Sequence, residues 1–288
     1  MRRPTSILDL PQELLDLVID HFYDDLATLR DCALVAHAWL QPAQTHLFRD
    51  IRLRHPTDIF TFRNLIIDRG YIARSVRILR INAKMFKPRY YGNRPVESPY
   101  IETIQDRIFT SLGQLRTLHF EDVHFDIFPL DRGLLDAIGK LPIHELKFSK
   151  CDFRNFETFE RFVFANTRCT HLSLDDIKWK EAPDHTTFSK SLSANRAALG
   201  LTHISLGSYC EIDLYSNWLS QTSVLSTLRS LEMTGLTDIH DVKLAGDLLK
   251  RVAGTLQHLR LKCSFSCAYE SQLLRQYTFP SHEYRSET

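Results

Sequence analysis

Apolar residues recur along most of the chain in one short pattern, apolar-x-x-apolar-x-apolar, which returns seven times. The copies are Val76/Leu79/Ile81, Leu115/Leu118/Phe120, Ile143/Leu146/Phe148, Cys169/Leu172/Leu174, Leu201/Ile204/Leu206, Leu228/Leu231/Met233 and Leu256/Leu259/Leu261. Successive middle positions lie 39, 28, 26, 32, 27 and 28 residues apart. Because five of these intervals fall in a narrow range, the pattern indicates repeated supersecondary units.

Amphipathic stretches of helical length separate the copies. They are Tyr100 to Leu112, Phe156 to Asn166, Phe188 to Leu199, Trp218 to Leu225 and Val242 to Val252. A strand followed by a helix, repeated along the chain, predicts an α/β fold in which parallel strands lie inside and helices outside.

The residues beside each middle position test this prediction, because alternate residues of a strand face opposite ways. They are Ile78/Arg80, Thr117/His119, Glu145/Lys147, His171/Ser173, His203/Ser205, Ser230/Glu232 and His258/Arg260. Only Ile78 is apolar, which is not the pattern of strands buried on both faces. We therefore expect one face of the sheet to be polar and open to solvent.

The first fifty-odd residues follow a helical pattern instead. Pro11 suits a first helical position, and Leu14, Leu17, Val18 and Phe22 recur behind it at helical spacing. Three short helices in about forty residues cannot bury this many large apolar side chains by themselves. Part of the apolar surface must dock on the rest of the chain or on a partner.

Two more helices are predicted in this region. Asp24-Asp25 ends the first helix and offers an N-cap for a second one, from Leu26 to about Cys32. A third apolar stretch stops at Pro42, and within it Val35 and Trp39 lie four residues apart, which places them on one helical face.

This N-terminal pattern resembles the F-box. The matching residues are Leu10-Pro11-x-Glu13-Leu14, Leu17-Val18, Leu34-Val35, Trp39 and Leu47-Phe48, and His46 to Leu53 is similar to fungal F-box proteins. The resemblance implies that a module spanning 1–54 binds a Skp-type adaptor, which links to a cullin-RING complex. By the same resemblance, the adaptor contact falls on Leu10, Pro11, Leu14, Leu17, Val18, Leu34, Val35 and Trp39.

The remainder, 55–288, resembles the irregular leucine-rich repeats that follow many F-boxes, with about seven repeats. The customary Asn after each strand is missing, and Cys151 alone supplies an accepted residue type there. The resemblance implies a small three-helix F-box-like module followed by an irregular leucine-rich-repeat solenoid. A polar, aromatic insertion from Lys84 to Pro99 accounts for the one long interval, and a short helix is expected at Ser271 to Tyr277.

Composition narrows the classes of partner. The formal net charge is +1, with 43% hydrophobic and 25% charged residues. A nucleic-acid or acidic-membrane binder usually carries a clear basic excess, so we expect neither partner.

Asp9, Glu13, Asp16 and Asp20 interrupt the apolar stretch behind the N-terminus, which excludes a membrane span there. The six cysteines never form Cys-x-x-Cys, which favours a reducing cytoplasmic or nuclear location with the thiols as small buried hydrophobes.

Catalytic chemistry has little support in the sequence. No phosphate-binding glycine loop, dinucleotide fingerprint or nucleophile elbow is present. The pair Cys263/Cys267 lacks further ligands, and His171 with His203, expected on adjacent strands, lacks a third ligand. We therefore expect no metal and no cofactor, and a non-catalytic protein.

The resulting hypothesis is a substrate-recognition subunit of an SCF-type (Skp-cullin-F-box) ubiquitin ligase that holds a substrate for other subunits. Its substrate is unknown; the candidate substrate-binding residues are Arg80, His119, Lys147, Tyr209, Trp218, Glu232 and Arg260. An alternative is a repeat scaffold whose N-terminal helices only cap the solenoid, which requires Leu14 and Trp39 to be buried against Val76 and Leu79. A third hypothesis, a hydrolase or transferase, requires a deep pocket that holds a carboxylate or His with a strongly shifted pKa.

Overall fold

A computed structural model describes residues 10–82, 90–91, 94–95, 108–125, 132–181, 200–236 and 239–263 of the chain. Within these residues, one parallel sheet has the strand order β1-β2-β5-β6-β7-β8-β9-β10, and β3 pairs with β4 in a separate antiparallel ribbon. The strands are β1 (Asp50–Leu53), β2 (Ile78–Asn82), β3 (Tyr90–Tyr91), β4 (Arg94–Pro95), β5 (Thr117–Glu121), β6 (Glu145–Phe153), β7 (His171–Trp179), β8 (His203–Leu206), β9 (Ser230–Leu236) and β10 (His258–Cys263).

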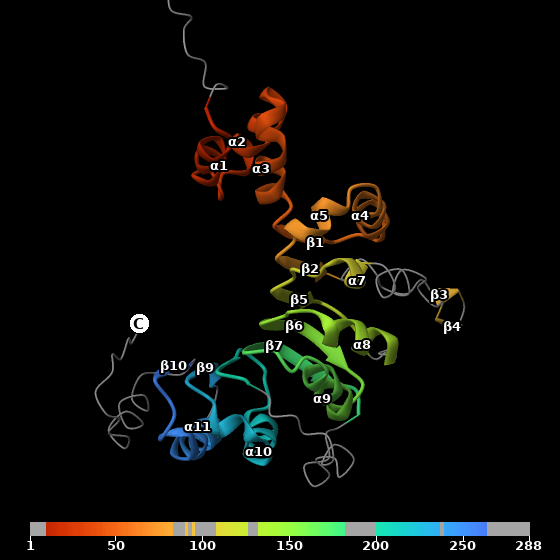
Figure 1. The fold of residues 1–288 in the computed structure, drawn as a ribbon. Coiled ribbons are helices and arrows are strands. Elements are labelled where there is room, and N and C mark those ends of the chain that lie inside the picture. Colours follow the sequence, from red (N-terminus) through yellow and green to blue (C-terminus); the bar gives the residue numbers. More distant parts are fainter. Residues whose placement is uncertain are drawn as a thin grey trace, which may run out of the picture.

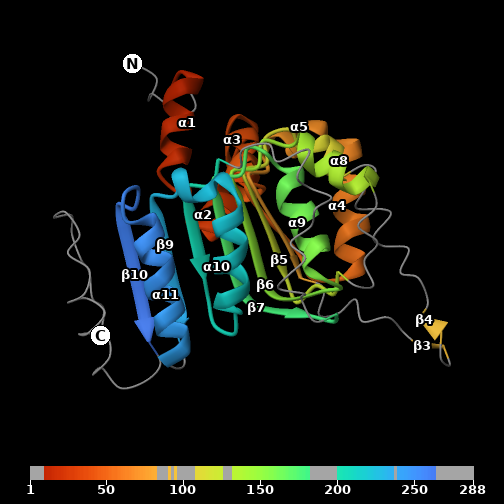
Figure 2. The same ribbon diagram turned by 90° about the horizontal axis from the view of Figure 1, so that it is seen from below.

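The strands follow an arc with helices along its outer side, and the first three helices stand beyond the β1 end (Figure 1). Figure 2 shows the strands side by side, with α9, α10 and α11 along one face. The helices are α1 (Gln12–Asp20), α2 (Leu26–Val35), α3 (His37–Leu47), α4 (Pro56–Asp68), α5 (Gly70–Ser75), α7 (Phe109–Ser111), α8 (Arg132–Lys140), α9 (Phe156–Ala165), α10 (Ile212–Gln221), the 3-10 helix η3 (Ser223–Ser226) and α11 (Ile239–Val252). The predicted α/β class with parallel strands is confirmed.

The seven predicted strand signals lie side by side in register. Their middle positions are direct partners across the sheet, in the row Leu79, Leu118, Leu146, Leu172, Ile204, Leu231 and Leu259. An eighth strand, β1, continues this row, because Ile51 pairs with Leu79. The sheet therefore begins at Asp50, inside the range predicted for the N-terminal module.

Burial alternates along the strands as the flanking residues predicted. In β2 the side chains of Leu79 and Ile81 are buried, and in β5 those of Leu118 and Phe120 are buried. The residues beside them on each strand are only half-buried. The buried side packs against the helices and is rich in aromatic rings. Phe120 stacks on Phe148 with ring centroids 5.7 Å apart, and Phe125 stacks on Phe153 at 4.6 Å.

Trp218 belongs to this core and not to a binding surface. It lies on α10 with 1% of its surface exposed, and its ring contacts Phe156 and Phe159. Its assignment as a substrate-binding residue is therefore wrong. The sequence predicted a helix that starts at Trp218, and the first residue of a helix does not show which face of it is buried. In the structure α10 begins earlier, at Ile212, and Trp218 lies on its buried face.

Buried thiols form hydrogen bonds between neighbouring repeats. The Cys151 Sγ donates to the Phe120 carbonyl at 3.5 Å, and the Cys210 Sγ donates to the Leu174 carbonyl at the same distance. Burial raises the pKa of both thiols to about 12. These thiols, with buried Cys32 and Cys169, are the small buried hydrophobes that the sequence predicted.

Other predicted helices have mixed outcomes. Those at Phe156 and Val242 correspond to α9 and α11. The stretches 188–199 and 271–277 lie outside the described residues, as do most of 84–99 and of 100–112. No described helix is both long and apolar enough to cross a membrane.

Close contact between the strand ends predicts one sensitive position. A Cβ on Gly235 would lie 2.5 Å from the Gly207 carbonyl oxygen and 2.7 Å from the Ser208 Cα, and these backbone atoms cannot move aside cheaply. We expect Gly235→Ala to lower the free energy of unfolding by about 1–3 kcal/mol. Chemical denaturation measures the change. Gly254→Ala is the control, because nothing lies within 4 Å of its Cβ; equal losses in both variants would contradict the packing shown.

Candidate functional site

The three N-terminal helices form a module with a core of its own. Ile19, Leu29, Cys32 and Ala43 are buried together, and the residues packed against them are Phe22, Ala33, Trp39 and Leu47. The predicted cap is confirmed: the Asp25 carboxylate accepts the backbone N–H groups of Ala27 and Thr28 at the start of α2, both at 3.1 Å.

The junction between α2 and α3 differs from the predicted one. Ala36 is extended (φ −148°, ψ 142°), so α2 ends at Val35 and α3 begins at His37. Val35 and Trp39 therefore do not share a helical face, and that prediction is wrong. The third helix also continues past Pro42 to Leu47.

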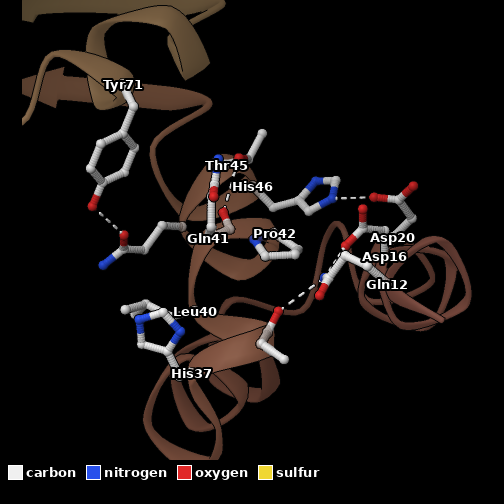
Figure 3. A pocket seen from close by; sticks show the side chains of 12 residues that line it. Gln12, Asp16, Asp20, His37, Leu40, Gln41, Pro42, Thr45, His46 and Tyr71 are labelled. Carbon is white, nitrogen blue, oxygen red and sulfur yellow. Dashed lines mark hydrogen bonds and ion pairs between the residues drawn. The ribbon is translucent and has the colours of Figure 1, made fainter. Parts of the chain in front are cut away.

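Pro42 lies inside α3, and a side chain supplies the hydrogen bond that proline cannot make. A proline lacks the N–H that would donate to the carbonyl four residues earlier, here Ala38. The Gln12 Nε2 donates to this carbonyl instead, at 3.1 Å, and also to the Asp16 Oδ1 at 2.7 Å (Figure 3). The first turn of α1 is thereby held beside the α2–α3 junction.

Large apolar side chains remain exposed on α1, just before it, and at the end of α2. We call them the exposed apolar face: Leu10 (38% exposed), Leu14 (45%), Leu17 (62%), Val18 (37%), Leu34 (85%) and Val35 (70%). Pro11 is exposed as well, whereas Trp39 is half-buried in the core of the module. On α1 the buried positions are Leu15 and Ile19. The helix therefore has two apolar sides, of which only that of Leu15 and Ile19 is buried within the described part of the chain.

The structure contradicts the alternative in which the N-terminal helices only cap the solenoid. This alternative requires Leu14 and Trp39 to be buried against Val76 and Leu79. Leu14 is 45% exposed, and Trp39 packs in the small core of the module, which is separate from the sheet core that contains Val76 and Leu79.

An open cleft of about 770 Å³ lies between the module and α5 (Figure 3). The Tyr71 Oη donates to the Gln44 Oε1 across it at 2.7 Å, and His46 Nε2 lies 2.7 Å from Asp20 Oδ1. The lining of the cleft comes from α1 and α3, with Tyr71 of α5 at one side. Nowhere in the described ranges do three His, Cys, Asp or Glu side chains gather as a possible metal site.

The polar face of the sheet carries most of the predicted substrate-binding residues. Arg80, His119 and Lys147 are direct partners on β2, β5 and β6, and Glu232 is the partner of Arg260. Tyr209 stands apart on the loop after β8, where it is 76% exposed with φ 57°.

Several of these side chains are already paired. Arg80 donates to both carboxylate oxygens of Asp50, at 3.0 Å and 2.9 Å. Lys147 lies 2.9 Å from Glu145, and Arg260 lies 3.1 Å from Glu232. Burial, and then the positive charge of Arg80, lowers the pKa of His119.

Two histidines stack on adjacent strands of the same face. The rings of His171 and His203 lie 3.9 Å apart and nearly parallel, at 11°. Each Nδ1 lies 2.8 Å from the hydroxyl of the preceding threonine, Thr170 or Thr202. Burial, and then the neighbouring His171 and His258, lowers the pKa of His203. The stack therefore favours the neutral form of this ring.

Comparison with known proteins adds no assignment: no protein-family model matches the chain, and a search of the curated proteins finds no match. Function must therefore be argued from the exposed apolar face and the polar face of the sheet.

The hydrogen bond from Gln12 to Ala38 predicts a coupling with Pro42. We expect Gln12→Ala to lower the free energy of unfolding by about 0.5–1 kcal/mol, because the Ala38 carbonyl loses its donor. In a Pro42→Ala background the cost should shrink, because the new N–H can donate to that carbonyl. A double-mutant cycle by thermal unfolding measures the coupling. Additive effects would show that Gln12 does not compensate for Pro42.

The stacked histidines predict a pH dependence of stability. Because the pKa of His203 is lower in the folded chain, the unfolded chain binds more protons as the pH falls. Neutral His203 makes its full contribution to the free energy of unfolding above about pH 6.5. This contribution is lost as the pH falls through the pKa of His203 in the folded chain. We expect His203→Gln to make the loss of stability between about pH 7 and pH 5 shallower. Urea unfolding across this range measures it, with His240→Gln as the control; an unchanged slope in His203→Gln would contradict the prediction.

Proposed function

We propose that this protein is the substrate-recognition subunit of an SCF-type ubiquitin ligase. In this proposal residues 10–47 are an F-box-like module that binds a Skp-type adaptor through the exposed apolar face. The sheet and its helices are an irregular leucine-rich-repeat solenoid that presents its polar face to a substrate protein. The observation that carries the proposal is the exposure of Leu17, Leu34 and Val35 on a module whose core is complete without them.

Energetics favour a partner for these side chains. Burying a Leu or Val side chain contributes roughly 1.5–3 kcal/mol, and a folded protein rarely leaves several of them exposed together. Leu34 and Val35 are 85% and 70% exposed. The N-terminal resemblance to the F-box names the adaptor as the partner that would cover them.

The repeated strands support the second part of the proposal. Strand partners in one register, at intervals near 28 residues, are typical of leucine-rich repeats. Such a receptor contributes no catalytic group. It acts by holding the substrate near the transfer machinery, which raises the effective concentration of the reacting groups.

Adaptor capture tests the proposal. We expect Leu17→Asp/Leu34→Asp to reduce co-purification with the Skp-type adaptor of the same host at least about tenfold, because two charges would be buried at the interface. The matched control is Ile67→Asp/Ile239→Asp, which changes two apolar residues of α4 and α11 that are 53% and 62% exposed. The control should capture the adaptor as the wild type does. Absence of capture by folded wild-type chain, or equal loss in both variants, would refute the adaptor assignment.

A further inference from the structure

Positive charge is concentrated at one end of the sheet, partly on its polar face and partly at the edge where the strands begin. We call this group the basic patch: Arg49, Arg52, Arg77, Arg80, Arg116 and Lys147, on or just before β1, β2, β5 and β6. In the same segments, 49–52, 77–80, 116–119 and 144–147, the carboxylates are Asp50 and Glu145. The patch is therefore strongly basic, although the whole chain carries a net charge of only +1.

Three arginines of the patch form a row where the strands begin. The backbone N–H of Arg77 donates to the Arg49 carbonyl at 2.9 Å, and that of Arg116 donates to the Arg77 carbonyl at 2.8 Å. The three residues therefore sit on successive rungs, about 4.8 Å apart. Burial, and then the charges of Arg116 and Arg49, lowers the pKa of Arg77. Like charges are thus held close together by the backbone.

This row has no carboxylate of its own in the described part of the chain. Arg116 Nη1 lies 2.7 Å from His144 Nε2, and Arg77 Nη1 donates to the Arg74 carbonyl at 2.7 Å. No ion pair involves Arg49, Arg77 or Arg116 there, whereas Arg80 and Lys147 in the next row are paired with Asp50 and Glu145. The uncompensated charge is therefore located on the arginine row.

We propose that the basic patch binds a carboxylate-rich peptide segment of a partner protein. The identification of that partner as the substrate rests on the proposed function; the binding itself does not. Arginine guanidinium groups bind carboxylates through two parallel hydrogen bonds, and a partner carboxylate removes the repulsion within the row.

The size and setting of the patch fit a peptide better than a nucleic acid. Four strands span about 15 Å, which about five residues of extended peptide cover. A nucleic acid held through its phosphates usually meets a longer basic track. A short acidic peptide in extended form is long enough to reach all three arginines of the row.

Fluorescence anisotropy with the full chain and no adaptor tests the proposal. The probes are a labelled peptide of about eight alternating Asp and Glu residues, its Asn/Gln counterpart, the same backbone carrying phosphoserines, and a single-stranded oligonucleotide. The test variant is Arg49→Gln/Arg116→Gln, which changes two exposed residues. The matched control is Arg229→Gln/Arg251→Gln, which removes two exposed arginines outside the patch.

We expect the Asp/Glu peptide to bind, the Asn/Gln peptide not to bind, and the test variant to lose at least about tenfold in affinity while the control keeps it. Higher salt should weaken the complex. The proposal is overturned if folded wild-type chain does not bind the Asp/Glu peptide, if both variants lose equally, or if the phosphoserine peptide or the oligonucleotide binds more tightly than the Asp/Glu peptide. Adaptor capture is a separate measurement, so either proposal can fail while the other stands.

Discussion

The structure depends on one backbone interaction that is repeated from strand to strand. At the start of each unit two successive N–H groups donate to a single carbonyl of the unit before it, as those of Arg116 and Thr117 do to the Arg77 carbonyl. This pairing fixes the register, so equivalent positions of every repeat form straight rows across the sheet. Leucines fill the row that faces the helices, and polar residues fill the rows that face away. The basic patch and the histidine stack both follow from it, because like residues on successive repeats are brought within about 5 Å.

The module and the sheet are joined by a short and well-braced connection. Only Phe48 and Arg49 separate α3 from β1, and Phe48 packs against the sheet core. Tyr71 adds a hydrogen bond to Gln44 across the cleft. These contacts brace the module against the N-terminal end of the sheet domain. A receptor that must deliver a substrate to machinery bound at its other end needs this property.

Much of the sheet could be predicted from the sequence, because the period of the apolar residues reports directly which side chains face the core. The signal also existed for β1, since Phe48, Ile51 and Leu53 repeat the pattern 28 residues before Leu79. These residues were instead assigned to the N-terminal motif that resembles the F-box. Arg49, Arg77 and Arg116 share the second position of that pattern, and the row of three was visible only once β1 was in place.

Local spacing predicted the module less well, because tertiary contacts decide its details. Nothing in the spacing of Val35 and Trp39 shows that Ala36 breaks the helix, or that a glutamine thirty residues before Pro42 compensates for it. Likewise, α1 carries two apolar sides, and the sequence alone does not tell which one, that of Leu14 or that of Leu15, is buried. Trp218 shows the same limit on α10, since burial depends on partners far away in sequence.

The central claim is that the apolar face of the module, and not the sheet, meets the adaptor. Amide hydrogen exchange of the chain, with and without the Skp-type adaptor of its host, tests this most directly. The account predicts slower exchange on adaptor binding in α1 and α2 and at the α2–α3 junction, with β5 to β9 unchanged. Slower exchange across the strands of the sheet, with α1 and α2 unchanged, would contradict it.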